Sequence, residues 1–305
     1  MTLRPDDCTL THSEFAKVRA EAERALREAG AMGVFPTPID QILNVAKVEE
    51  VKEDVLNPSF INKMRAKAGG LLKSAVSKVI GLFDAVAGLI FLDHSLYLPK
   101  RRFVTFHEAA HGFLPWQRGM YKIVEDCEMA LEPETAELFD RQANVFAAEV
   151  LFQLDTFATM AADEKFSIWT PIGLAKKFQA SLYASIRQYV SKSNRRCAVL
   201  VLNKPELIEG DGFRATLRRA IQSPAFTEVF GQRAWQTVFT PDDEFGALVP
   251  LGTRKASGKR GMFLTDANGE RHDCVVESFT QTHQVFILIH CVKTLGPPAL
   301  LLRQS

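Results

Sequence analysis

The feature that most constrains this chain is a pair of histidines four residues apart, with a glutamate directly after the first. The motif reads His107-Glu108-Ala109-Ala110-His111. On an α-helix, residues four apart lie on one face, so both imidazoles can point at one metal ion. Glu108 lies about 100° around the helix from His107, where it can reach a water on that metal more easily than the metal itself. The pattern therefore predicts a metal-binding helix with the residue types that zinc-assisted hydrolysis requires.

The residues around the motif favour a buried helix over a surface helix that happens to contain two histidines. Ala109 and Ala110 are small and strongly helix-forming. Phe103, Phe106 and Phe113 supply apolar flanks. Because polar groups in a buried helix are costly unless something binds them, the context favours a metal site.

A catalytic zinc site has three protein ligands, so one more must come from elsewhere in the chain. A second helix is predicted over residues 133–152, where apolar residues follow helical spacing. On it, Asp140 is the favoured third ligand, and Glu137, one turn earlier, is its main rival. Asn144, one turn after Asp140, is expected to hydrogen-bond a ligand histidine. Acidic residues crowd this region, so an ordinary surface role for Asp140 stays open.

At these two helices the chain resembles the ImmA/IrrE-type zinc metallopeptidases, a gluzincin-like family. The resemblance rests on His-Glu-Ala-Ala-His-Gly at 107–112 and on acid-x-x-Ala-Asn-x-Phe-Ala at 140–147, and it extends over residues 12–195. It implies a zincin-like core in an α+β fold, with Zn²⁺ held by His107, His111 and Asp140. The family usually has glutamate where this chain has Asp140. Because aspartate is one methylene shorter, the backbone must come closer or the site is weaker.

The resemblance further implies a selective metallo-endopeptidase that acts on a protein substrate. A helix-turn-helix transcriptional repressor, cut in response to stress or to a mobile element, is the substrate it suggests. Glu108 would take a proton from the attacking water and hand it to the leaving amine. Tyr121 is a candidate donor to the oxyanion, with Arg118 as an alternative. Cys127 as an inhibitory zinc ligand is the less favoured interpretation, because an isolated cysteine is usually packed.

Two other functions stay open from the sequence. The chain could be a non-catalytic regulatory protein with a structural metal site that binds DNA or a protein partner, which a weak site at Asp140 would favour. It could also be a toxin–antitoxin component whose hydrolase acts on a paired protein. Metal stoichiometry and the dependence of cleavage on Glu108 distinguish the non-catalytic regulatory protein from a peptidase.

Composition limits the partners and the compartment. The 305 residues, 47% of them hydrophobic, can bury a sizeable core or two to three compact units. A net charge of +1 provides no overall field that favours nucleic acid. Five widely spaced cysteines without a Cys-x-x-Cys motif predict reduced thiols. With no signal peptide and no apolar run of about 18 residues, the sequence predicts a cytoplasmic protein without a membrane span.

Before the motif, the chain predicts two helices, a basic segment and a hairpin. A helix is expected over residues 12–29, and a short second one begins near Pro38. Residues 59–83 are basic and amphipathic, and a solvated helix face is favoured there over a surface for DNA or an acidic partner. Residues 86–92 and 96–98 are predicted to pair as a hairpin. The resemblance places the strand before the metal helix at a sheet edge over the cleft, where a substrate peptide adds by main-chain hydrogen bonds.

Three domains are predicted: a metallopeptidase domain at residues 1–160, a helix-turn-helix-like segment at 161–197, and a regulatory or partner-binding domain at 198–305. In the middle segment, Ser181 would cap the second of two short basic helices. A packing unit is favoured there over a DNA-binding unit, because the net charge is small.

The last domain is expected to be mostly β. The predicted elements are a buried strand at 198–202, a helix at 213–230, a hairpin of 261–265 with 271–276 around Asn268-Gly269, and a strand at 284–290. His272, Cys274, His290 and Cys291 do not predict a second metal site, because adjacent residues on a strand point to opposite faces.

Overall fold

The computed structural model of the chain describes residues 8–52, 81–126, 131–210, 212–252 and 255–292. Within them the protein is a mixture of helices and strands with a mostly β C-terminal part, as the sequence predicts. Backbone contacts divide the chain into two compact units. The N-terminal unit comprises residues 4–159 and 173–184, and the C-terminal unit comprises mainly residues 160–172 and 185–305. The segment at 161–197 thus contributes to both units.

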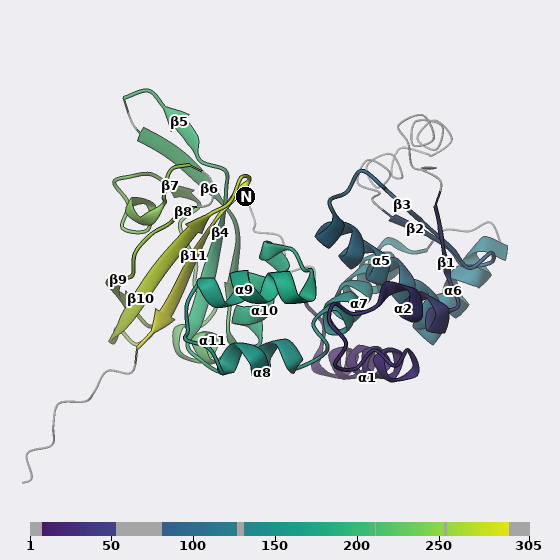
Figure 1. Ribbon diagram of the computed structural model, residues 1–305. Coiled ribbons are helices and arrows are strands. Elements are labelled where there is room, and N and C mark those ends of the chain that lie inside the picture. The colour runs from purple at the N-terminus through teal and green to yellow at the C-terminus, as the bar shows by residue number, and fades with distance from the viewer. Residues whose placement is uncertain (1–7, 53–80, 127–130, 211, 253–254, 293–305) are drawn as a thin grey trace, which may run out of the picture. The chain divides into compact units, whose positions relative to one another are not determined.

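The N-terminal unit consists of helices packed together, with a small three-stranded sheet on one side of them (Figure 1). Its helices are α1 (His12–Glu28), α2 (Ile39–Ala46), α5 (Leu98–Phe113), α6 (Pro115–Asp126) and α7 (Pro133–Leu151), and its strands are β1 (Glu49–Val51), β2 (Gly81–Asp84) and β3 (Leu89–Leu92). Helix α7 packs against α5 and α1, and α2 packs against α5. The helices predicted at 12–29 and 133–152 are confirmed.

Aromatic side chains fill the interior of this unit. Phe106 of α5 and Phe146 of α7 are fully buried, and the Phe146 ring centroid lies 5.5 Å from that of Phe113. A second group surrounds Phe178, whose ring centroid lies 5.8 Å from that of Phe152 and 5.0 Å from that of Phe35. This packing fixes α7 alongside the helix that carries the histidine motif.

The hairpin predicted at residues 86–98 is wrong. Strand β3 pairs antiparallel with β2, which precedes it, and the chain turns at residues 85–88, where Gly88 has a φ of +68°. The residues after β3 begin α5 instead, with Pro99 in the first turn. Proline suits that position because its fixed φ is helical and its missing N–H would be unpaired there anyway.

Strand β3 is also not the edge strand that the family resemblance implies. It pairs in parallel with β1 and antiparallel with β2, so the strand order is β1-β3-β2. Residues 59–80 of the predicted basic segment lie outside the described residues.

The C-terminal unit is built on an antiparallel sheet (Figure 1). In the described residues its strand order is β5-β6-β4-β11-β10-β8, with β7 paired to β6 and β9 to β10. The strands are β4 (Cys197–Asn203), β5 (Glu206–Ile208), β6 (Gly212–Gln222), β7 (Val238–Phe239), β8 (Lys255–Ala256), β9 (Arg260–Thr265), β10 (Arg271–Thr280) and β11 (Gln284–Cys291). The predicted strands at 198–202 and 284–290 and the hairpin around Gly269 are confirmed.

The helix predicted at residues 213–230 is wrong over most of its length. Residues 212–222 form strand β6, and only Pro224–Phe230 is helical, as α11. Phe213 and Ala215 are buried while Arg214 and Thr216 between them are exposed, which is the two-residue period of a strand. Strands β5 and β7 pair with this part of β6, and β4 pairs with its second half.

The two predicted short helices with a turn between them are confirmed as α9 (Trp169–Phe178) and α10 (Leu182–Ser191), which follow α8 (Thr156–Ala162). Gln179 in the turn has a φ of +47°, and the Ala184 N–H donates to Ser181 Oγ at 3.1 Å, which caps α10. No single helix in the described ranges is long and apolar enough to cross a membrane, although the bent pair α7 and α8 together passes on length and composition.

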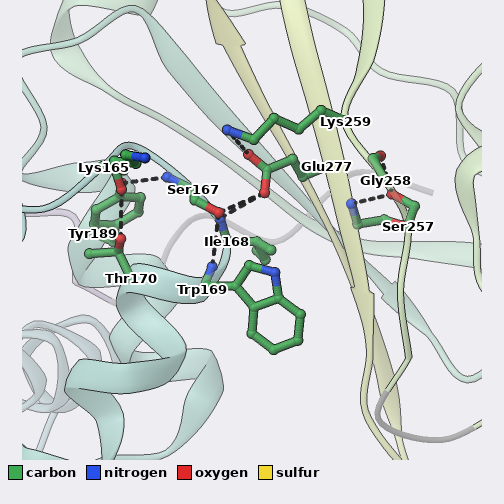
Figure 2. Close-up of polar contacts among 11 residues, drawn as sticks. Lys165, Ser167, Ile168, Trp169, Thr170, Tyr189, Ser257, Gly258, Lys259 and Glu277 are labelled. Carbon is green, nitrogen blue, oxygen red and sulfur yellow. Dashed lines mark hydrogen bonds and ion pairs between the residues drawn. The ribbon is translucent and has the colours of Figure 1, made fainter.

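A buried carboxylate attaches the segment before α9 to the sheet of the C-terminal unit (Figure 2). Glu277 of β10 is 3% exposed. Its Oε2 accepts from Ser167 Oγ at 2.7 Å and from the Ile168 N–H at 3.3 Å, and its Oε1 lies 3.4 Å from Lys259 Nζ. These partners offset the cost of burying the charge, so the start of α9 is held to β10.

Candidate metal centre

Helices α5 and α7 bring together two imidazoles and one carboxylate. The Nε2 atoms of His107 and His111 are 3.3 Å apart, and Asp140 Oδ1 lies 3.9 and 4.0 Å from them. Ligand atoms bound tetrahedrally at about 2.0–2.2 Å are about 3.3–3.5 Å from one another. The histidine pair has this separation, and the carboxylate is about half an ångström farther away. These three groups could hold a metal ion.

The far side of each imidazole is held by a side-chain amide. His107 Nδ1 lies 3.0 Å from Asn144 Oδ1, and His111 Nδ1 lies 2.7 Å from Gln117 Oε1. An amide oxygen only accepts, so each ring carries its proton on Nδ1 and leaves the Nε2 lone pair for a metal. This is the tautomer that the donor set of a zinc site needs.

Gln117 is the residue that sequence reasoning missed. It is fully buried on α6, and its amide nitrogen donates to Phe139 O at 3.2 Å and to Gln142 Oε1 at 2.8 Å. Trp116 Nε1 also donates to Gln142 Oε1, at 2.8 Å. With its nitrogen occupied by two acceptors, the Gln117 amide must turn its oxygen toward His111. No spacing in the sequence signals this, because the partners come from two helices.

Burial sets the protonation of the histidines. It lowers the pKa of His111 to about 3, with the charge of His107 adding to the effect. It also lowers the pKa of His107, while the charge of Asp140 opposes that shift. Both imidazoles are therefore neutral near pH 7, which is the form that binds a metal.

Glu108 is 6% exposed, and burial raises the pKa of its carboxyl to about 8, with the charge of Asp140 raising it further. The charges of Asp140 and Glu108 also contribute, after burial, to raising the pKa of the Tyr121 phenol. These three groups therefore share one electrostatic environment. A carboxyl with a pKa near neutrality can both accept and release a proton.

The two candidates for third ligand lie in different surroundings. Asp140 has an exposed side chain, 66% of its area, on the side of α7 nearest the histidines. Partial loss of hydration raises the pKa of its carboxyl, an effect that His107 opposes and Glu137 reinforces. Glu137 instead accepts a hydrogen bond from Arg141 Nη1 at 2.8 Å and is not within reach of the histidine nitrogens.

Of the candidate oxyanion donors, Tyr121 lies beside the histidines. Its ring centroid is 5.3 Å from that of His111, with the two planes nearly perpendicular. Arg118 instead donates from Nη1 to Ala46 O at 3.0 Å and Gly112 O at 3.2 Å, which holds backbone in place. Cys127 lies outside the described residues.

The glycine after His111 permits a close approach of α5 to the segment before β1. A Cβ atom at Gly112 would lie 2.5 Å from Val48 Cγ1 and 3.3 Å from the Phe83 ring. A side chain here would push the histidine-bearing end of α5 outward. The glycine of the motif thus has a packing role.

Replacing Gln117 with leucine is expected to weaken zinc binding by about 10–100-fold, because His111 loses the acceptor that fixes its tautomer. Competition with a chromophoric chelator measures the affinity. Asn144→Leu is the matched variant for His107 and should give a loss of similar size. Unchanged affinity in both would mean that these amides do not orient the ligands.

The comparisons with known proteins agree with the motif. Residues 70–185 match the family model described as Peptidase_M78, IrrE N-terminal-like domain. A solved structure of a Mycobacterium tuberculosis transcriptional regulator resembles the chain with a TM-score of 0.51, at 12% identity, over 90% of this chain and 87% of that one. At this identity the likeness concerns the fold. A comparison with curated proteins gives no match.

The match to the family model contains His107, Glu108, His111, Asp140 and Asn144, so it covers both helices on which the sequence resemblance rests. The resemblance to the ImmA/IrrE group is confirmed. Over residues 70–185 the chain is therefore similar to the IrrE N-terminal-like domain family, Peptidase_M78.

Proposed function

We propose that this chain is a zinc-dependent endopeptidase with a zincin-like core, which cleaves a specific protein. A helix-turn-helix transcriptional repressor, cut in a stress or mobile-element response, is the substrate class we favour. The observation that carries the proposal is the convergence of two neutral imidazole nitrogens and one carboxylate oxygen, with an amide behind each imidazole. The buried carboxyl of Glu108, the residue after His107 on the same helix, is the group that we assign to proton transfer.

His107, His111 and Asp140 would hold the metal. A zinc ion supplies Lewis-acid polarisation and lowers the pKa of water when bound. Glu108 then accepts a proton from the attacking water and delivers it to the leaving amine nitrogen. Tyr121 is the donor that we assign to the oxyanion, since its raised pKa keeps the phenol protonated.

Metal content of the purified chain tests the ligand set. The unmodified chain is expected to hold about one zinc ion, His111→Ala none, and Asp140→Ala a sharply reduced amount. Glu137→Ala is the matched control, because it removes a carboxylate one turn earlier on the same helix and should leave the metal in place. Full zinc in Asp140→Ala would move the third ligand elsewhere. No metal in the unmodified chain, even after zinc is supplied, would refute the peptidase.

A regulatory, DNA-binding function is the second candidate. It is favoured by the helix pair α9 and α10 with the basic residues Lys176 and Lys177, and by the similar solved structure, which is that of a transcriptional regulator. Titration of a labelled random-sequence duplex at two salt concentrations tests it. Binding through phosphate contacts would fall steeply as salt rises. We expect little binding, because a net charge of +1 provides no overall field that favours nucleic acid.

A further inference from the structure

Two thiols of the C-terminal unit face each other across neighbouring strands. Cys274 on β10 is directly opposite Cys291 on β11, and their Sγ atoms are 3.0 Å apart. The Cys291 N–H donates to Arg196 O, on the other side of β11, and the Val292 N–H donates to Asp273 O. The cysteines therefore occupy a non-hydrogen-bonded position of the ladder, where opposite Cα atoms are about 4.5 Å apart. A disulfide spans Cα separations of about 4.4–6.8 Å, so this position accepts one without a shift in strand register.

The two thiols differ in access and in acidity. Cys274 is 2% exposed in the hydrophobic core on one face of the sheet, whereas Cys291 is partly exposed at the end of β11. The hydrogen bond from the Cys274 thiol lowers the pKa of Cys291, and the charge of Arg196 lowers it further. The same hydrogen bond, together with burial, raises the pKa of Cys274. Cys291 is thus the more acidic thiol of the pair and the one that forms a thiolate more readily, with Cys274 held beside it.

Cys197 shows what an unreactive thiol of the same unit looks like. It is fully buried, and burial raises its pKa to about 11. It pairs with His290, the neighbour of Cys291, so its side chain points to the opposite face of the sheet. Cys197 therefore has neither a partner thiol opposite it nor access to a solvent-borne oxidant.

We propose that Cys274 and Cys291 form a peroxide-reactive pair that closes a reversible disulfide between β10 and β11. The Cys291 thiolate attacks one oxygen of a hydroperoxide, the O–O bond breaks, and the other oxygen leaves with a proton as water or an alcohol. The sulfenic acid on Cys291 is then attacked by the Cys274 sulfur, the S–O bond breaks, and the thiol proton leaves with the oxygen as water. Two thiols are oxidised and one peroxide is reduced.

Peptide mapping of the full-length chain tests this inference, which is independent of the metal centre. The reduced protein is treated with a small excess of hydrogen peroxide, alkylated and digested with trypsin. Both cysteines fall in one tryptic peptide, residues 272–293, because no lysine or arginine lies between them. We expect this peptide to lack both alkyl groups and two hydrogen atoms. Cleavage after Glu277 should leave its two parts joined until a dithiol reductant is added.

Variants assign the roles. Cys291→Ser should slow oxidation of Cys274 by at least about tenfold, because the more accessible and more acidic thiol of the pair is gone. Cys274→Ser should stop the reaction at a sulfenic acid on Cys291 that dimedone traps, and Cys274→Ala serves if serine disturbs the core. Cys197→Ser is the matched control and should leave the disulfide unchanged. The proposal is wrong if both thiols stay alkylatable at peroxide doses that oxidise the unfolded chain, or if Cys291→Ser leaves Cys274 equally reactive.

Discussion

Glu108→Gln is expected to lower peptide-bond cleavage by about 10²–10⁴-fold while leaving the zinc content of the chain unchanged. Glutamine has nearly the same shape as glutamate, so the buried position on α5 can accept it without a cavity. Its amide cannot take a proton from water, so the step that we assign to Glu108 is lost. The ligand atoms at His107, His111 and Asp140 are untouched by the change, which is why metal binding should survive.

The rates are measured with zinc-loaded protein on labelled casein and on a library of unstructured peptides, with new termini identified by mass spectrometry. Glu164→Gln is the control, because it makes the same chemical change at an exposed position outside the metal centre. Activity retained in Glu108→Gln would assign the base elsewhere. Cleavage lost together with the zinc would mean that Glu108 contributes to holding the metal.

The second large effect concerns the stability of the metal-free chain. Glu108 has a folded-state pKa of about 8, raised from an ordinary value of 4.5. Between these pH values the folded state keeps a proton that the unfolded state has released, so the free energy of unfolding falls as pH rises through this window. Glutamine is neutral at every pH, so the free energy of unfolding of the variant does not fall in this window for that reason. Metal-free Glu108→Gln should therefore be more stable than the unmodified chain by a few kcal/mol at pH 8–9, and about equally stable below pH 5.

Urea unfolding of chelator-treated protein at several pH values measures this difference. The lowered pKa values of His107 and His111 make the free energy of unfolding fall as pH drops below the pKa of a free histidine. The unmodified chain and Glu108→Gln share this effect, so it does not contribute to the difference between them. Glu164→Gln should show no such pH-dependent difference in stability from the unmodified chain. Parallel pH profiles for the unmodified chain and Glu108→Gln would mean that Glu108 titrates as it does in the unfolded chain.

Local periodicity could be predicted from the residues alone. Residues four apart on a helix share a face whatever surrounds them, so the His107–His111 pair could be read directly and with it the chemistry that the pair favours. Asp140 and Asn144 follow the same rule on the second helix. The turn at Asn268-Gly269 was also readable, since Gly269 adopts a φ of +84° that other residues rarely adopt.

Which segments lie next to one another could be seen only in the folded chain. Strand β3 pairs with β2, and residues 212–222 form a strand, because neighbouring segments supply backbone hydrogen-bonding partners there. A local sequence pattern does not show which segments will be neighbours. Gln117 of α6 turns its amide oxygen toward His111 because α7 supplies both acceptors for its amide nitrogen. Cys274 and Cys291 face each other because the register of β10 against β11 sets them opposite. Each of these contacts joins residues whose spacing in sequence has no fixed relation to distance, so the packed chain alone fixes them.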